Sequence, residues 1–322
     1  MVVPPGTGRP SRRSRCSWSR TGAACVQESV RIPFVGSAAI AAGHLTRSQL
    51  RHRYRPIYHG VYVPLRHAVS LRDRILGATL ASPGAVVAGV AASALHGAKW
   101  VDDDAPVELI GTARPQRGLI VRAETLHEDE VTTVAGVPVT TLERTAFDLA
   151  RHLPRGKAVE RLDALMNAHP FSAEGVMLIA KQHPGVRGRR RLRVALPLVD
   201  GGAESLPETR LRLLFVDAGL PCPTTQFTIY DHDGSYVRRI DMCWEDFKVG
   251  AECDGEQHLT SRHQYVLDVR VNRVLQRLGW HVIHVVKEDC AAAIVAEART
   301  ALLSRGWQPT PRNRRNGRMA GP

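Results

Sequence analysis

The sequence has few cysteines, and their spacing is typical of neither a metal site nor a disulfide framework. No CxxC pair is present, so neither a zinc knuckle nor a small disulfide-rich fold is expected. This pattern favours a reducing compartment, and we expect the protein to be cytoplasmic. The six cysteines are Cys16, Cys25, Cys222, Cys243, Cys253 and Cys290.

Long apolar runs are also missing. The longest, Ala85 to Leu95, is interrupted by Gly89 and Ser93 and is shorter than the roughly 18 residues that a membrane-spanning helix needs. The first 20 residues are rich in Pro, Gly, Ser and Arg and lack the apolar segment of a secretory signal. We therefore expect neither a membrane span nor a membrane partner.

Acidic residues are absent from the two ends of the chain. The 322 residues carry a formal net charge of +13. Residues 1–20 contain five Arg and residues 308–322 contain four, so the ends hold nine of these charges. We expect disordered basic tails at 1–31 and 308–322. An excess of positive charge favours a polyanionic partner, and duplex DNA is the nucleic acid that we expect.

The chain is long enough for two domains, and its 43% hydrophobic residues are typical of globular proteins. A glycine-containing segment at 197–203 indicates a linker. We predict one domain at 32–196, a winged helix followed by an α+β unit, and another at 203–307. The expected fold class is therefore a two-domain α+β or α/β protein.

The N-terminal part begins with signals for a helix–turn–helix and a hairpin. A short helix should end at Gly43, and Thr46 with Gln49 forms a capping box at the start of a second helix. His59-Gly60 then separates two short segments with strand character, which predicts a hairpin. This order of elements is that of a winged helix.

The second of these helices carries basic residues on one face. Arg47 and Arg51 are spaced i, i+4, whereas Leu50 and Tyr54 lie on another face. The basic face is a candidate DNA-binding surface, with the apolar face packed inward. The alternative is an ordinary solvated helix.

The middle of the chain shows signals for helices and strands in alternation. Two Ala-rich helices are expected in 71–100 and two strands at 106–111 and 117–124. Thr140 and Glu143 form a capping box for a further helix. An arginine cluster at 187–193 is compatible either with phosphate contacts or with a solvated face.

The C-terminal part gives the clearest pattern, which predicts the order αβββαβα. A helix opens at Ser205 and ends at Gly219. Strands are expected at 224–230, 236–244 and 247–253, followed by a helix, another strand and a final helix near 289–304.

Two acids on adjacent predicted strands form a candidate metal site. If Glu245-Asp246 is a two-residue turn, Asp241 lies opposite Gly250 and diagonal to Glu252. Diagonal carboxylates are close enough to share one hard divalent cation. Alternatively, Arg239 lies opposite Glu252 and pairs with it on a solvated face.

These acids lie in the stretches RIDMCW, KVGAECDGEQH and DVRVNRVLQRLGW. Over about 203–306 the pattern resembles the PD-(D/E)xK nuclease superfamily, and in particular its branch similar to very-short-patch-repair endonucleases. The resemblance implies a restriction-endonuclease-like domain in which Asp241 and Glu252 hold Mg²⁺ or Mn²⁺. It also implies that Glu208 assists and that Asp254 and His258 complete the catalytic site.

The sequence departs from this superfamily at two positions. Ile240 replaces the proline, and Asp254 stands where a lysine is usual, so Lys248 or His258 would have to assist the attacking water. The other assignment of Glu208 is a capping box with Ser205. Three further histidines are expected to be structural: His263, His281 and His284.

The N-terminal half resembles a second family. The stretches GHLTRSQLRHRYRPIYHGVYVP and VPVTTLERTAFDLAR are similar, over about 36–165, to AbiEi-type antitoxins of bacterial abortive-infection systems. That resemblance implies DNA binding and a toxin partner. The expected function is a DNA-binding, Mg²⁺-dependent endonuclease in phage defence or DNA repair. The alternative is a non-catalytic, antitoxin-like repressor with a degenerate nuclease fold.

Overall fold

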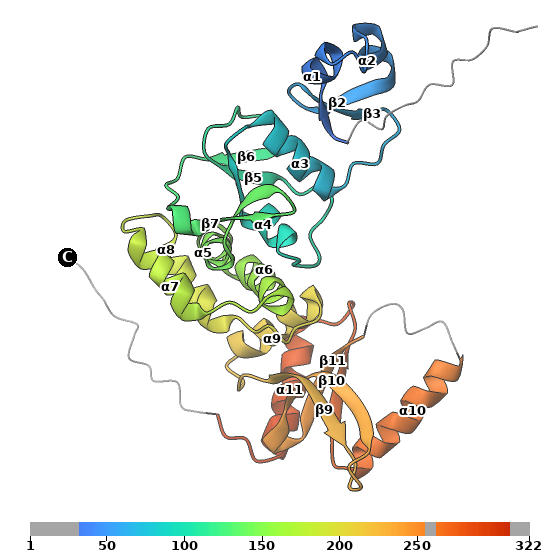
Figure 1. Ribbon diagram of the computed structural model, residues 1–322. Helices are drawn as coiled ribbons and strands as arrows, with labels where there is room; N and C mark the ends of the chain where they lie inside the picture. Colours follow the sequence, from blue (N-terminus) through green and yellow to red (C-terminus); the bar gives the residue numbers. More distant parts are fainter. Residues whose placement is uncertain (1–31, 255–261, 310–322) are drawn as a thin grey trace, which may run out of the picture. The chain divides into compact units, whose positions relative to one another are not determined.

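The computed structural model describes residues 32–254 and 262–309. Within these ranges it contains eleven α-helices and three β-sheets, a mixed α+β architecture (Figure 1). None of the described helices has the length and apolar character needed to cross a membrane. The predicted tail at 1–31, nearly all of the one at 308–322, and His258 lie outside the described residues.

The first elements form a small sheet with two short helices, and the sheet order is β1-β3-β2. Thr46 caps α2 as predicted, because its Oγ1 accepts from Gln49 N at 3.1 Å and its N–H donates to Gln49 Oε1 at 2.8 Å. The predicted hairpin is also confirmed, with Gly60 at φ +75° in its turn. The bounds are β1 Phe34–Val35, α1 Gly36–Ala41, α2 Arg47–Arg53, β2 Tyr54–Tyr58 and β3 Val61–Pro64.

A five-stranded sheet follows, in the order β6-β5-β4-β8-β7. The strands predicted at 106–111 and 117–124 are present, and they pair in parallel. The capping box predicted at Thr140 is wrong by one residue. Thr141 caps the next helix, whereas Thr140 ends β8 and bonds the Thr145 hydroxyl at 2.7 Å. The bounds are α3 Leu71–Ala81, β4 Val86–Ala88, α4 Gly89–Leu95, β5 Val107–Ile110, β6 Leu119–Arg122, β7 Val131–Val134 and β8 Val137–Thr140.

Four helices, α5 to α8, pack next to this sheet. In α5 the apolar Ala146, Leu149 and Ala150 are buried, and so are three charged residues, Arg144, Asp148 and Arg151. Helix α5 is therefore surrounded by other elements, and its charged side chains must find partners inside the protein. The bounds are α5 Leu142–His152, α6 Arg155–Ala168, α7 Ala173–Gln182 and α8 Arg189–Ala195.

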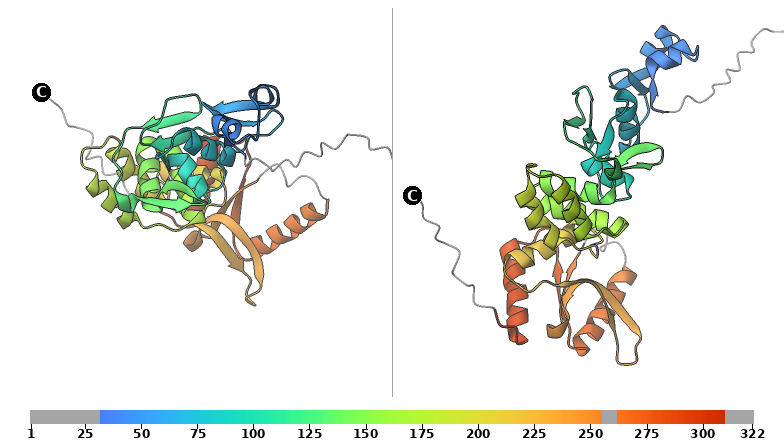
Figure 2. Two further views of the ribbon diagram at one scale, coloured as in Figure 1. Left: turned by 45° about the horizontal axis from the view of Figure 1, so that its top comes forward. Right: turned by 60° about the vertical axis from the view of Figure 1, so that its left-hand side comes forward.

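The C-terminal elements follow one another in the predicted order αβββαβα. Their sheet has the order β12-β11-β10-β9, with β11 and β12 parallel and the other pairs antiparallel. Helix α10 covers one face, and α9 with α11 covers the other (Figure 2). The bounds are α9 Leu206–Asp217, β9 Thr224–Tyr230, β10 Tyr236–Trp244, β11 Val249–Cys253, α10 Arg262–Arg277, β12 His281–Val285 and α11 Ala291–Ser304.

The turn between β10 and β11 is longer than the predicted two residues. A 3₁₀ turn, Glu245–Phe247, is followed by Lys248 at φ +48°. Trp244 therefore pairs with Val249 rather than with Phe247, and Gly250 pairs with Cys243 rather than with Asp241. The predicted register is wrong by two residues.

The segment predicted as a linker, 197–203, is tied to both of its neighbours. Asp200 N donates to Asp163 Oδ1 of α6 at 2.8 Å, and Asp163 Oδ2 bonds Thr209 and Arg212 of α9 at 2.9 and 2.7 Å. Leu213 of α9 belongs to the hydrophobic core of α5 to α8. The division into domains at 32–196 and 203–307 remains a prediction, and any such domains share a buried junction.

This junction allows a matched test of one buried and one exposed ion pair. Asp163→Ala leaves Arg212, only 2% exposed, without its nearest carboxylate. We expect a loss of about 3–5 kcal/mol in the free energy of unfolding, measured by urea denaturation. Asp217→Ala removes the exposed partner of Arg155 and should cost less than about 1 kcal/mol. Equal losses would contradict this account.

Candidate functional site

The predicted DNA-binding residues lie on α2, and both side chains are exposed. Arg47 and Arg51 face solvent, whereas Leu50 is buried. Tyr54 packs edge-on against Phe34, with ring centroids 5.1 Å apart. The predicted separation of basic and apolar faces is therefore present, and contact with DNA remains a prediction.

Asp241 lies on β10 and is held by the backbone of β11. Its Oδ2 accepts a hydrogen bond from Cys253 N at 2.8 Å. Burial raises the pKa of Asp241, and the negative charge of Asp254 adds to that effect. Continuing the observed register by one step places Asp241 level with Glu252 rather than diagonal to it.

Glu252 lies on β11 and is 5% exposed. Arg238 Nε donates to its Oε1 at 2.7 Å, so the partner is Arg238 and not Arg239 as considered from the sequence. Arg239 instead bonds Glu204 at 2.7 Å. The other oxygen, Glu252 Oε2, is buried and has no hydrogen-bond partner among the described residues. Burial raises the pKa of Glu252, against the attraction of Arg238 and His284.

Glu208, on the first turn of α9, accepts a hydrogen bond from the local backbone and also lies near Asp241. Ser205 Oγ accepts from Glu208 N, as expected of a helix cap, but the Glu208 carboxylate bonds Glu204 N at 2.8 Å and Gln226 Nε2 at 2.9 Å. Burial raises the pKa of Glu208, and the charge of Asp241 contributes to the increase. The two assignments made from the sequence are therefore compatible.

Asp254 interacts with His284, a residue that the sequence analysis expected to be only structural. His284 Nδ1 lies 3.1 Å from Asp254 Oδ2 and 3.6 Å from Glu252 Oε2. Because β11 and β12 are parallel, His284 is paired with Glu252 across the sheet. His284 was expected to be structural, and its partner Asp254 lies 30 positions away in the sequence.

Neither Lys248 nor Gly250 contributes to this site. Lys248 Nζ donates to Leu278 O at 3.0 Å, at the opposite end of β11 from Glu252, so it does not reach the acids. Gly250 does not leave room for an ion, because an added Cβ would lie 2.7 Å from Ile240 Cδ1. Ile240 packs with the α10 face, whereas Met242 packs on the opposite face, so strict alternation along β10 fails here.

A second polar cluster, which the sequence analysis missed, surrounds α5. Arg144, 1% exposed, donates to Glu130 Oε2 at 2.5 Å, to Asp148 at 3.1 Å and to Glu124 at 3.2 Å. Arg151 also contacts Asp148, at 2.9 Å, and Glu124. The partners come from separate segments of the chain, so no periodicity in the sequence indicates this buried network.

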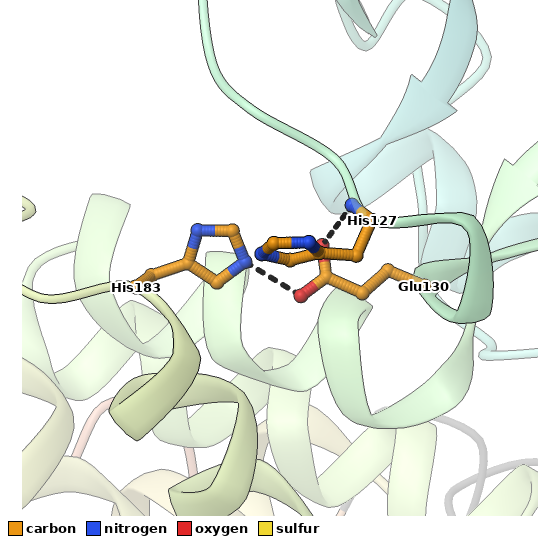
Figure 3. A group of neighbouring side chains, drawn as sticks. All are labelled: His127, Glu130 and His183. Carbon is orange, nitrogen blue, oxygen red and sulfur yellow. Dashed lines mark hydrogen bonds and ion pairs between the residues drawn. The ribbon is translucent and has the colours of Figure 1, made fainter.

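Histidines lie at the edge of this cluster. His183 Nε2 is 2.6 Å from Glu130 Oε1, and the ring of His127 lies 5.0 Å from that of His183 (Figure 3). Burial would raise the pKa of Glu130, but the hydrogen bond with His183 and the charge of Arg144 lower it below its usual range. Glu130 is therefore ionised at neutral pH.

Three groups of described side chains could hold a metal ion, since their ligand atoms lie within 4.8 Å of one another. One contains the predicted ligand Glu252, but Asp241 is not a member of it. The groups are Glu252, Asp254 and His284; His127, Glu130 and His183; and Glu124, Asp148 and His152.

The chain is similar in sequence to known proteins and matches one domain family. It is 31% identical over 176 residues to the uncharacterized proteins MT2308 and Rv2248, from two strains of Mycobacterium tuberculosis. Each match covers 55% of this chain and 64% of the relative, so the chain spans less than two thirds of their length. Residues 85–198, from β4 to the end of the turn after α8, match the AbiEi antitoxin C-terminal domain.

Proposed function

We propose that the protein is a cytoplasmic bacterial DNA-binding protein with a Mg²⁺- or Mn²⁺-dependent endonuclease centre in its C-terminal part. The observation that carries this proposal is the buried Glu252 Oε2, which has no hydrogen-bond partner among the described residues and lies near Asp241 and Asp254. A buried carboxylate oxygen without a partner is costly, and a hard divalent cation satisfies it. The order αβββαβα supports a restriction-endonuclease-like fold.

Asp241 and Glu252 would hold such an ion, which requires Asp241 to move closer, because it is not a member of the group formed by Glu252, Asp254 and His284. Glu208 would add negative charge from α9. When bound, the ion would stabilise charge on the scissile phosphate and lower the pKa of an attacking water. His284 donates Nδ1–H to Asp254, so its Nε2 could accept a proton in place of the missing lysine.

DNA binding is proposed for the N-terminal part. The order helix, capped basic helix, hairpin supports a winged helix, and exposed Arg47 and Arg51 would contact the duplex. The match of residues 85–198 to an antitoxin domain supports a toxin as protein partner.

A second candidate function, a non-catalytic antitoxin-like repressor, is favoured by one specific contact. Arg238 already occupies Glu252 Oε1 at 2.7 Å, and its charge opposes that of a cation. A nuclease fold that has lost activity can keep such a pair for stability alone. Cleavage assays separate the two functions.

The first prediction concerns cleavage. Purified protein should cut DNA in Mg²⁺ or Mn²⁺, and Asp241→Asn or Glu252→Gln should lower the rate on the order of a hundredfold or more, because each removes a charge that would hold the ion. Electrophoretic cleavage and binding assays measure this, with binding retained. Asp246→Asn, an exposed acid in the adjacent turn, should leave cleavage unchanged. A wild type that binds DNA but never cuts it would favour the repressor.

The second prediction concerns stability without metal. In EDTA, Asp241→Asn should raise the free energy of unfolding by about 1 kcal/mol, because it removes one of several buried like charges. The asparagine oxygen can still accept from Cys253 N. Added Mg²⁺ should then raise the melting temperature of the wild type and not that of the variant. Asp246→Asn is again the control, and a destabilised Asp241→Asn would contradict the prediction.

The third prediction concerns α2. Arg47→Ala combined with Arg51→Ala should weaken DNA binding by about 1–3 kcal/mol if either makes a base contact. If they bind phosphates instead, the slope of log K against log salt should fall by about 0.9 for each phosphate no longer neutralised. Fluorescence anisotropy at several salt concentrations measures both quantities. Arg72→Ala, an exposed arginine on α3, controls for charge, and equal effects there would remove α2 from the interface.

A further inference from the structure

We propose that His127, Glu130 and His183 form a binding site for a divalent transition metal of the zinc class. The side chains converge from two segments, the turn before β7 and the end of α7, although Glu130 and His183 lie 53 positions apart in the sequence (Figure 3). Their ligand atoms all lie within 4.8 Å of one another. Two imidazoles and one carboxylate are a donor set that zinc uses when it keeps a fourth position open.

Local structure holds each of the three residues in place. His127 precedes the 3₁₀ turn Glu128–Glu130, and its N–H donates to Glu130 Oε2 at 3.2 Å. His183 caps the C-terminus of α7, and its ring stacks on Phe147 with centroids 5.9 Å apart. Glu130 and His183 are buried and His127 is exposed, so the site would open to solvent on one side.

The hydrogen bonds leave the required ligand atoms available. Arg144 Nη1 donates to Glu130 Oε2 at 2.5 Å and to Thr125 O at 3.0 Å, which uses both of its hydrogens. The 3.4 Å separation from Arg144 Nη1 to His183 Nε2 is therefore a contact without a donated proton. His183 Nε2 and Glu130 Oε1 face each other at 2.6 Å, bridged by an imidazole proton that a metal ion would displace.

Small movements would complete the coordination. Zinc binds imidazole nitrogen and carboxylate oxygen at about 2.0–2.2 Å, so ligand atoms around a tetrahedral ion are about 3.3 Å apart. The His183–Glu130 separation of 2.6 Å would widen by less than about 1 Å. His127, being exposed, can rotate toward them at little steric cost.

The charges of the cluster favour a cation. Two guanidinium groups, Arg144 and Arg151, face three carboxylates, Glu124, Glu130 and Asp148. With all three acids ionised, this set has a net charge of −1. Burial raises the pKa of Asp148 to about 7, so that acid is only partly ionised at neutral pH. A cation at His183 and Glu130 would offset the remaining negative charge.

The two other candidate groups fit zinc less well. In the group of Glu124, Asp148 and His152, Arg151 contacts both carboxylates. The group of Glu252, Asp254 and His284 has two carboxylates and one imidazole, which suits a harder cation. Of these three groups, the one at Glu130 alone combines two imidazoles with a carboxylate oxygen that no described guanidinium contacts.

The test uses the full chain with Asp241→Asn and Glu252→Gln, so that the proposed nuclease site does not contribute. Calorimetry with Zn²⁺ should show one site, and Zn²⁺ should raise the melting temperature. Co²⁺ should give the visible absorption of a four-coordinate ion with nitrogen and oxygen ligands. A thiolate-to-cobalt charge-transfer band would place the ion on cysteine and overturn the proposal, and so would failure to bind either metal.

Single substitutions in this background locate the ion. His127→Ala removes an exposed ligand and leaves Glu130 paired with Arg144, so the fold should persist. Zn²⁺ affinity should fall about tenfold or more, at least as much as when an outer-shell partner is removed. His183→Gln should act in the same direction. His169→Ala, an exposed histidine just after α6, should change nothing. Unchanged affinity in both ligand variants would refute the site.

Discussion

The buried guanidinium of Arg144 is the interaction on which the central part of the protein depends. It bonds Glu124, Glu130 and Asp148 while only 1% exposed, and so links the turn before β7 to α5. An unpaired charge at this depth would cost several kcal/mol, so each carboxylate has a structural role whatever else it does. The same pairing leaves Glu130 Oε1 directed at His183. Structural pairing and the proposed metal site thus share one carboxylate without competing for one oxygen.

Local signals in the sequence predicted the elements that depend on a few neighbouring residues. The capping box of Thr46 and Gln49 and the hairpin at Gly60 are present because each is decided within four residues. The order αβββαβα was predictable for a similar reason, since periodicity and turn residues mark each element separately. Strands β4, β7 and β8 were not predicted.

Long-range pairing was not predictable. The β10–β11 turn has four residues instead of two, so the register moved by two. Continued by one step, the observed register places Asp241 level with Glu252 rather than diagonal to it. His284 was missed because only the parallel pairing of β11 with β12 brings it to Glu252. Arg144 was missed because a charged residue on α5 gives no sequence signal of burial.

The two polar clusters differ in how completely their charges are paired, and this difference bears on function. Around α5, Arg144 contacts Glu124, Glu130 and Asp148, and Arg151 contacts Glu124 and Asp148. At the C-terminal acids, Arg238 meets one oxygen of Glu252, while Oε2 has no hydrogen-bond partner among the described residues. Packing alone does not favour a buried oxygen without a hydrogen-bond partner, because a hydrogen bond from water or from a second donor would lower the free energy.

Incompletely paired acids with perturbed pKa values are typical of sites that bind something. Burial raises the pKa values of Glu208, Asp241 and Glu252, so these three carboxyl groups resist ionisation together. A bound cation would lower these pKa values, because it stabilises the ionised form of every acid near it. Arg144 and Arg151 already supply this effect around α5, whereas at the C-terminal acids one guanidinium supplies only part of it. Ion pairing among the described residues is therefore less complete at the C-terminal acids than around α5.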